Sequence, residues 1–266
     1  MTFLSEFNPL YAFSGLVVGL LVGMTGVGGG SLMTPILILL FGVAPASAVG
    51  TDLLYACITK SGGVLVHGLN GTVDWRVVGR LCTGSLPASV VTLLVLYFLN
   101  VQSAASNALF SGALGLTLLL TAAVLVFRRR FAEIYAARVG KLDEYRLRQL
   151  TILTGAVLGV LVSVSSVGAG AMGATALILL YPEMPASRIA GSDIAHAVPL
   201  TLVAGLGHLF LGTIDLVLLV SLLVGSLPGI FVGSSLVLRI PERALRHTLA
   251  AILAIVAFRL VWAAWG

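Results

Sequence analysis

The chain alternates between apolar runs and short polar or glycine-rich breaks, with five apolar segments in each half. A helix that crosses a membrane needs about 20 residues, and the last three segments of each half are long enough. The first two are shorter, since residues 31–43 would reach only about 18 Å as a helix. The expected segments are 10–24, 31–43, 47–67, 75–99 and 106–127, and then 151–165, 171–181, 188–210, 214–237 and 242–265. The pattern predicts an all-α polytopic membrane protein, in which each half has two short helices followed by three spanning helices.

The composition strengthens this prediction. Hydrophobic residues occupy 59% of the 266 positions and charged residues only 9%. Such a chain cannot bury its apolar surface in one water-soluble core. The formal net charge of +5 is therefore read as a set of topology signals, and no nucleic-acid partner is expected. The N-terminus lacks a basic stretch and a small-residue cleavage pattern, so the first apolar segment is expected to stay in the protein.

An internal repeat organises the chain. A shift of 140 residues places the letters "LILL" at 37–40 on the same letters at 177–180. After one inserted residue the shift becomes 141, and Asp52 matches Asp193. Further matches are Gly28 with Gly168, and "GSLP" at 84–87 with "GSLP" at 225–228. The chain is therefore divided into a first repeat at 1–127, a linker at 128–150 and a second repeat at 151–266.

The basic residues predict which segments face the cytoplasm. Seven of the fifteen Lys and Arg residues lie within 128–150, so this linker is assigned to the cytoplasmic side, as a surface helix near anionic lipid headgroups. Six of the other eight join that side if each repeat crosses the membrane an odd number of times. Odd crossings invert the second repeat relative to the first and place both termini outside. Inverted-topology repeats are typical of secondary transporters, so the protein is not expected to be an enzyme.

Two glycine-rich breaks separate the short segments of each repeat. The first is "TGVGGGS" at 25–31, and the second is "SSVGAGA" at 165–171. In inverted-repeat transporters, such breaks point free backbone N–H groups at an anion near the membrane midplane. The alternative is that these glycines only allow close helix packing. The predicted anion-binding residues are Thr25, Gly26, Gly28, Gly29, Gly30 and Ser31 in the first break, and Ser165, Ser166, Gly168 and Gly170 in the second.

Ionisable residues inside the apolar segments are further candidates, because burying a charge in a membrane is costly. Lys60 either holds the anion as a counter-charge or extends its stem to the interface. Asp52 and Asp193 either cap a helix or lie in its early turns, where the helix dipole favours an acid, or they carry protons. They are expected near opposite membrane faces. His196, three residues after Asp193 on the same helical face, is a proton-relay candidate. Asp74 is expected to cap the segment that follows it.

The two cysteines allow a second class of function. Cys57 and Cys82 both fall in apolar segments, where free cysteines usually act as packing residues. A thiol-redox membrane protein would use them as an exchanging pair, but neither cysteine has a counterpart in the other repeat. An anion channel is a further alternative, because the sequence does not separate a channel from a carrier. No metal site and no cofactor are expected.

Three blocks of sequence carry a family likeness: "GLVVGLLVGMTGVGGGSLMTPILILLFGV", "PASAVGTDLL" and "HGLNGTVDWR". Together they resemble the TauE/SafE family of sulfite exporters, over nearly the whole chain. The resemblance implies a transporter of the bacterial inner membrane that exports sulfite or a small organosulfonate such as sulfoacetate. The second repeat departs from the pattern, because "SVGAGA" holds fewer glycines than "GVGGGS". The expected partners are a small anion and membrane lipid, and a homodimer stays open.

Overall fold

The computed structural model describes residues 9–25, 30–99, 104–138, 143–168, 170–235 and 242–265. These residues form ten α-helices joined by short connections and contain no strand, which confirms the expectation of an all-helical protein. The helices are α2 (Pro9–Thr25), α3 (Gly30–Phe41), α4 (Pro45–Leu69), α5 (Trp75–Phe98), α6 (Ala104–Arg138), α7 (Glu144–Ser165), α8 (Ala171–Leu180), α9 (Ala186–Phe210), α10 (Leu216–Ser235) and α11 (Glu242–Trp265).

Four of the described helices are long and apolar enough to cross a membrane, namely α5, residues 110–127 of α6, α7 and α9. They expose large apolar side chains, among them Leu94 of α5 and Leu153 of α7, as contact with lipid requires. α4 has 25 residues, but Asp52 and Lys60 interrupt its apolar sequence. The length and apolar surface of these helices support a location in a membrane.

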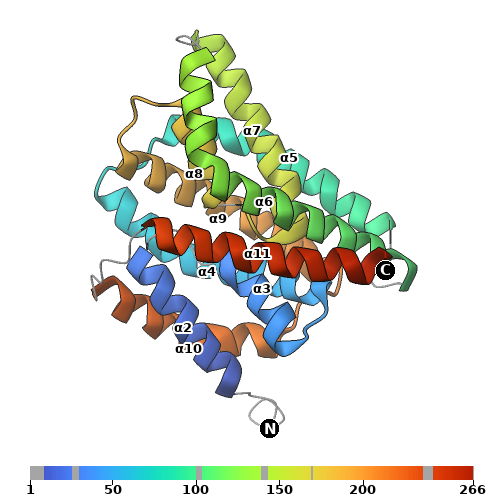
Figure 1. The fold of residues 1–266 in the computed structure, drawn as a ribbon. Coiled ribbons are helices and arrows are strands. Elements are labelled where there is room, and N and C mark those ends of the chain that lie inside the picture. Colours follow the sequence, from blue (N-terminus) through green and yellow to red (C-terminus); the bar gives the residue numbers. More distant parts are fainter. Residues whose placement is uncertain are drawn as a thin grey trace.

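The linker expected at 128–150 differs from the prediction. Residues 128–138 continue α6, and α7 begins at Glu144, so the described part of the linker extends two long helices and forms no separate surface helix. The prediction of a short first helix in the second repeat is also wrong, because α7 has 22 residues. The cause is local: "EYRLRQL" is rich in good helix formers, with an acid in the first turn. Figure 1 shows the ends of α6 and α7 projecting together beyond the other helices.

Each main helix pair combines one helix from each repeat. α2 packs against α10, and α5 packs against α7. Under the sequence repeat, α2 corresponds to α7 and α10 corresponds to α5, so the two pairs are equivalent. α4 packs against α9 and α6 against α11, and in both cases the partners are counterparts of each other. In Figure 1, α2 and α10 lie side by side at the lower end, away from α5 and α7. The two repeats are therefore interlocked.

Glycines set how closely the paired helices approach. A Cβ added to Gly84 of α5 would lie within 3 Å of the α7 backbone, at the nitrogen of Ala156 and the carbonyl carbon of Ile152. At the matching position of α10, a Cβ on Gly225 would meet the α2 backbone at Ala12 in the same way. Backbone atoms cannot move aside as a flexible side chain can, so these contacts require glycine.

Candidate functional site

The candidate site is built on α4 and α9, which pack against each other in the middle of the molecule (Figure 1). α4 contributes Asp52 and Lys60, while α9 contributes Asp193 and His196. These four side chains, named here the central cluster, are 0%, 5%, 2% and 0% exposed in that order. Ionisable groups buried this deeply in a membrane protein are costly and usually functional, so the central cluster is the leading candidate site.

Lys60 lies near both carboxylates of the central cluster. Its ammonium group interacts electrostatically with Asp193 and with Asp52. His196 also lies within electrostatic range of Lys60. The expected position of the two aspartates near opposite membrane faces stays a prediction. Lys60 is buried, which favours the alternative in which it acts as a counter-charge over the one in which it extends to the interface. The side-by-side packing of α4 and α9 brings these groups together.

Each carboxylate lies against the start of the short helix that precedes its own helix, which is α3 for Asp52 and α8 for Asp193. Within their own helices, α4 and α9, both aspartates are the eighth residue, so neither is a helix cap. Oδ2 of Asp52 accepts hydrogen bonds from the backbone nitrogen (3.2 Å) and Oγ1 (2.6 Å) of Thr34 in α3. In the first turn of α8, a Cβ on Gly173 would overlap Oδ1 of Asp193. Oδ1 of each aspartate has no hydrogen-bond partner among the described residues.

Two aromatic residues, one helical turn further along α4 and α9, extend the site. Nε2 of His196 lies 2.8 Å from Oγ of Ser85 in α5. Tyr55, the counterpart of His196, is buried beside Ser226 of α10, the counterpart of Ser85. The hydroxyls of Tyr55 and Ser226, and Nδ1 of His196, have no hydrogen-bond partner in the described part of the chain. The two serines were not predicted, although the duplicated "GSLP" contains both of them.

The second glycine-rich break connects α7 to α8. α7 ends at Ser165 and α8 begins at Ala171. Between them Ser166 has a φ of 56°, while Gly168 and Gly170 have φ angles of 123° and 128°. Angles in this range are accessible to glycine at little cost, which explains why glycines occur here. The backbone between α7 and α8 is therefore irregular, and it lies beside the central cluster because Ser166 neighbours Asp52.

The two serines of this break have different surroundings. Ser166 lies next to Asp52, and its buried Oγ has no hydrogen-bond partner among the described residues. Oγ of Ser165 is occupied, because it donates to the carbonyl oxygen of Leu161 (2.8 Å) and accepts from the backbone nitrogen of Val167 (3.2 Å). Of the two predicted hydroxyl donors of this break, Ser165 already has hydrogen-bond partners, and Ser166 has none among the described residues.

Most of the first glycine-rich break lies outside the described residues. α2 ends at Thr25, and α3 begins at Gly30, which Ser31 follows. The predicted residues outside the description are Gly26, Gly28 and Gly29. The anion-binding role expected of this break stays a prediction.

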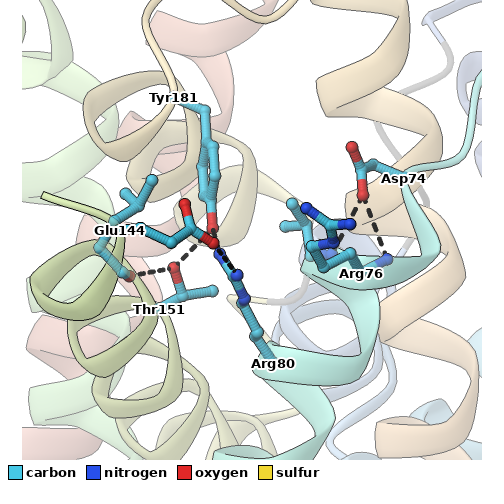
Figure 2. Close-up of polar contacts among 8 residues, drawn as sticks. Asp74, Arg76, Arg80, Glu144, Thr151 and Tyr181 are labelled. Carbon is cyan, nitrogen blue, oxygen red and sulfur yellow. Dashed lines mark hydrogen bonds and ion pairs between the residues drawn. The ribbon is translucent and has the colours of Figure 1, made fainter.

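A second polar cluster joins α5 to α7 and to the end of α8 (Figure 2). Arg80 of α5 forms an ion pair with Glu144 of α7, and its Nη1 donates to the hydroxyl of Tyr181 at 3.4 Å. The Tyr181 hydroxyl also lies 2.8 Å from Oγ1 of Thr151. Nearby, Asp74 accepts hydrogen bonds from two backbone N–H groups in the first turn of α5, which confirms the predicted N-cap. These contacts hold the start of α5 against α7 and α8.

The first repeat makes the counterpart of this contact with different groups. Tyr11 and Phe41 match Thr151 and Tyr181 in the sequence repeat. Their rings form an edge-to-face pair with centroids 4.8 Å apart. The same pair of positions is therefore joined by a hydrogen bond in one repeat and by an aromatic contact in the other.

In the described structure, neither cysteine forms a disulfide or belongs to a group of metal-binding side chains. Cys57 of α4 is buried, Cys82 of α5 is partly buried, and both are free thiols. Among the described residues, no group of three or more His, Cys, Asp or Glu side chains is placed to hold a metal ion. The groups that the site offers to a ligand are one ammonium, two carboxyls, one imidazole and several hydroxyls.

The sequence is similar to one family of membrane proteins over nearly its whole length. The family profile described as "Sulfite exporter TauE/SafE" matches residues 11–260. The chain belongs to the TauE/SafE family. Similarity to individual proteins extends over the same length. The probable membrane transporter protein YjnA of Bacillus subtilis is 38% identical over 253 residues, which cover 93% of this chain and 97% of YjnA.

Other relatives of this TauE/SafE protein are more distant. The probable membrane transporter protein YdhB of Bacillus subtilis is 24% identical over 241 residues, covering 88% of this chain and 91% of YdhB. A probable membrane transporter protein of Xylella fastidiosa is 25% identical over 264 residues, covering 95% of this chain and 94% of the relative. No solved structure matches the chain. Family membership identifies this TauE/SafE protein as a membrane transporter.

Proposed function

We propose that this protein is a secondary transporter that exports a small anion, namely sulfite or an organosulfonate such as sulfoacetate. The observation that carries the proposal is the burial of Lys60, a basic side chain, on the central α4–α9 pair. An ammonium group in the interior of a membrane protein can replace the water that an anion loses when it enters. The choice of a sulfur-containing anion rests on the family.

The glycine-rich breaks are proposed to supply the other groups of the anion site. The first turn of α8 carries the positive end of its helix dipole, and the unpaired hydroxyl of Ser166 lies at the same break. The backbone nitrogens of Met172 and Gly173 already donate to the carbonyl oxygen of Gly168. The proposed backbone donors of this break are therefore those that precede Met172, including Gly170. The first break is proposed to act in the same way at the start of α3.

Alternating access is the proposed mechanism, and the two repeats are proposed to be inverted in the membrane. In that arrangement, the α2–α10 contact on one side of the site corresponds to the α5–α7 contact on the other side. Matching glycine contacts at Gly84 and Gly225 support the equivalence of the two pairs. Exchanging the two sets of contacts would open the central cluster to one side of the membrane at a time.

The proposed location is the bacterial inner membrane. The concentration of Lys and Arg in residues 128–150 supports a cytoplasmic position for this linker, with both termini outside. The proposed partners are the transported anion and membrane lipid, and assembly as a homodimer stays a prediction.

Transport by purified protein in liposomes tests this function. We expect radiolabelled sulfite or sulfoacetate to enter protein-containing vesicles faster than protein-free vesicles, and Lys60→Gln to abolish the difference. Arg259→Gln is the matched control, because Arg259 also lies in an apolar helix but is exposed. If neither anion enters under any imposed potential or pH gradient, the proposed substrates are wrong. If Lys60→Gln transports as well as Arg259→Gln does, Lys60 is not part of the anion site.

The same vesicles separate a carrier from an anion channel. A carrier saturates with anion concentration, and unlabelled anion on one side accelerates entry of labelled anion from the other. A channel shows neither effect, so flux that rises linearly without counter-transport would refute alternating access.

A further inference from the structure

Building on the proposed function, we infer that the transported anion occupies the central cluster together with one proton for each negative charge that it carries. Asp193 and Asp52 take up these protons, so the site serves anions with one or two negative charges. The inference rests on where the two carboxylates lie, on the charge balance of the cluster, and on the buried polar atoms that lack partners.

Both carboxylates occupy places where the anion is proposed to bind. Asp52 accepts two hydrogen bonds from Thr34 near the start of α3, and Asp193 lies against Gly173 at the start of α8. Lys60 interacts electrostatically with both carboxylates. An anion that approaches Lys60 or either helix start must therefore add its charge to that of a carboxylate, or the carboxylate must first become neutral.

The charge balance favours neutralisation of the carboxylates. With Lys60 protonated and both aspartates ionised, the three side chains sum to one negative charge. A monovalent anion would add a second negative charge in a buried site with a low effective dielectric, where excess charge is costly. When Asp193 binds a proton from water, the sum returns to one negative charge. A divalent anion requires a second proton, which Asp52 takes up.

The structure offers a place for each proton. Oδ1 of Asp193 and Oδ1 of Asp52 have no hydrogen-bond partner among the described residues, so each can bind a proton without losing an existing bond. The buried hydroxyl of Ser166 lies next to Asp52 and can accept a hydrogen bond from its protonated carboxyl. Asp193 is protonated first, because the two hydrogen bonds from Thr34 stabilise Asp52 as a carboxylate.

The helices packed on α4 and α9 bring no further charged side chain to the cluster in the described structure. α3, α8 and α10 contain no charged residue, those of α5 and α7 lie in the first two turns, and those of α6 lie beyond residue 127. The remaining titratable neighbours are Tyr55 and Cys57 of α4 and His196 of α9. Asp193 and Asp52 are thus the carboxyl groups that can balance the charge of the anion beside Lys60.

Proton counting with the wild-type protein tests the inference directly. Sulfoacetate is the probe, because both of its acidic groups are fully ionised near neutral pH and it carries no proton itself. Uptake of radiolabelled sulfoacetate and the internal pH, reported by a trapped dye, are followed while potassium and valinomycin fix the potential at zero. We expect two protons to enter with each sulfoacetate, and accumulation to follow an imposed pH gradient but not an imposed potential. Uptake without protons that follows the potential would overturn the inference.

Asp193→Asn distinguishes this inference from the proposed function. The amide resembles the protonated carboxyl, so we expect exchange of labelled for unlabelled sulfoacetate to persist at equal pH. The proton count should fall from two to one, and net transport should become sensitive to potential. Asp143→Asn, which changes an exposed acid before α7, is the control and should behave as wild type.

The outcomes separate the two claims. If the wild type exchanges no anion, the proposed function fails. If it exchanges the anion but Asp193→Asn still moves two protons with each sulfoacetate, only this inference fails. If Asp193→Asn does not fold, the proton count of the wild type decides the question. Two protons per anion would also mean that export is driven by the outward gradient of the anion and not by the membrane potential.

Discussion

Gly84 of α5 is predicted to be a position where one added methyl group destabilises the fold. In the structure, a Cβ at this position would lie 2.8 Å from the nitrogen of Ala156 and 2.9 Å from the carbonyl carbon of Ile152, and closer still to the Ile152 oxygen. Ordinary contacts of a Cβ begin at 3.4 Å. Relieving the contact with the Ala156 nitrogen alone requires α5 and α7 to separate by 0.6 Å (3.4 minus 2.8), and the closer Ile152 oxygen requires a larger separation.

The expected cost follows from this overlap. Inserting a methyl group into a well-packed contact costs about 1–3 kcal/mol. Alanine is a better helix former than glycine and returns at most about 1 kcal/mol. Because the overlap at Gly84 is with backbone atoms, the cost of the inserted methyl group lies at the upper end of its range, about 2–3 kcal/mol. The net loss for Gly84→Ala is then about 1–2 kcal/mol, and in a protein of this size it lowers Tm by about 2–8 °C.

A matched control lies on the same helix. Gly79 is exposed, and a Cβ there would meet nothing within 4 Å. Thermal unfolding of both variants in detergent, followed by tryptophan fluorescence, should give an unchanged or higher Tm for Gly79→Ala and a lower Tm for Gly84→Ala. Equal Tm values for the two variants would show that the contact between α5 and α7 is not as close as the structure has it.

Two further predictions concern residues outside the central cluster. His208→Ala should lower the free energy of unfolding by about 1–3 kcal/mol more than His67→Ala does, because it removes the 2.9 Å hydrogen bond to the buried carbonyl oxygen of Ser163. Equal losses in thermal unfolding would contradict this reading of His208. Replacing both Cys57 and Cys82 with Ser should leave anion flux in liposomes unchanged, and loss of flux would favour the thiol-redox alternative over the proposed function.

The helices could be predicted from the sequence because their signals are local. Apolar runs place most of the ten described helices within a few residues of their observed bounds, and Asp74 marks the start of α5 through its own hydrogen bonds. α6 and α7 were the exceptions, because α6 continues past residue 127 to Arg138 and α7 already begins at Glu144. The first turns of α7 are polar and follow a basic stretch, so composition assigned them to the linker although they are good helix formers.

The central cluster could be predicted only in part. Burial cost in a membrane identifies Lys60, Asp52 and Asp193 one at a time, as intramembrane charges. Their meeting depends on α4 packing against α9, and the sequence carries no local signal for that contact. Ser85 and Ser226 were missed for the same reason, because their partners, His196 and Tyr55, come from other helices. The repeat was the available signal, because it pairs them with each other.

The repeat also shows where the two halves differ, and these differences bear on the number of anion sites. Asp52 and Asp193 are duplicated, but Lys60 is matched by Thr201, whose hydroxyl donates to the carbonyl oxygen of Ala197 in its own helix at 2.8 Å. A hydroxyl that satisfies its own helix cannot balance a buried charge. One ammonium group therefore lies near both carboxylates, and in the proposed mechanism its charge balances a single anion in each chain. Two symmetric half-sites would each need a lysine, so the asymmetry at this pair of positions favours one shared site between the repeats.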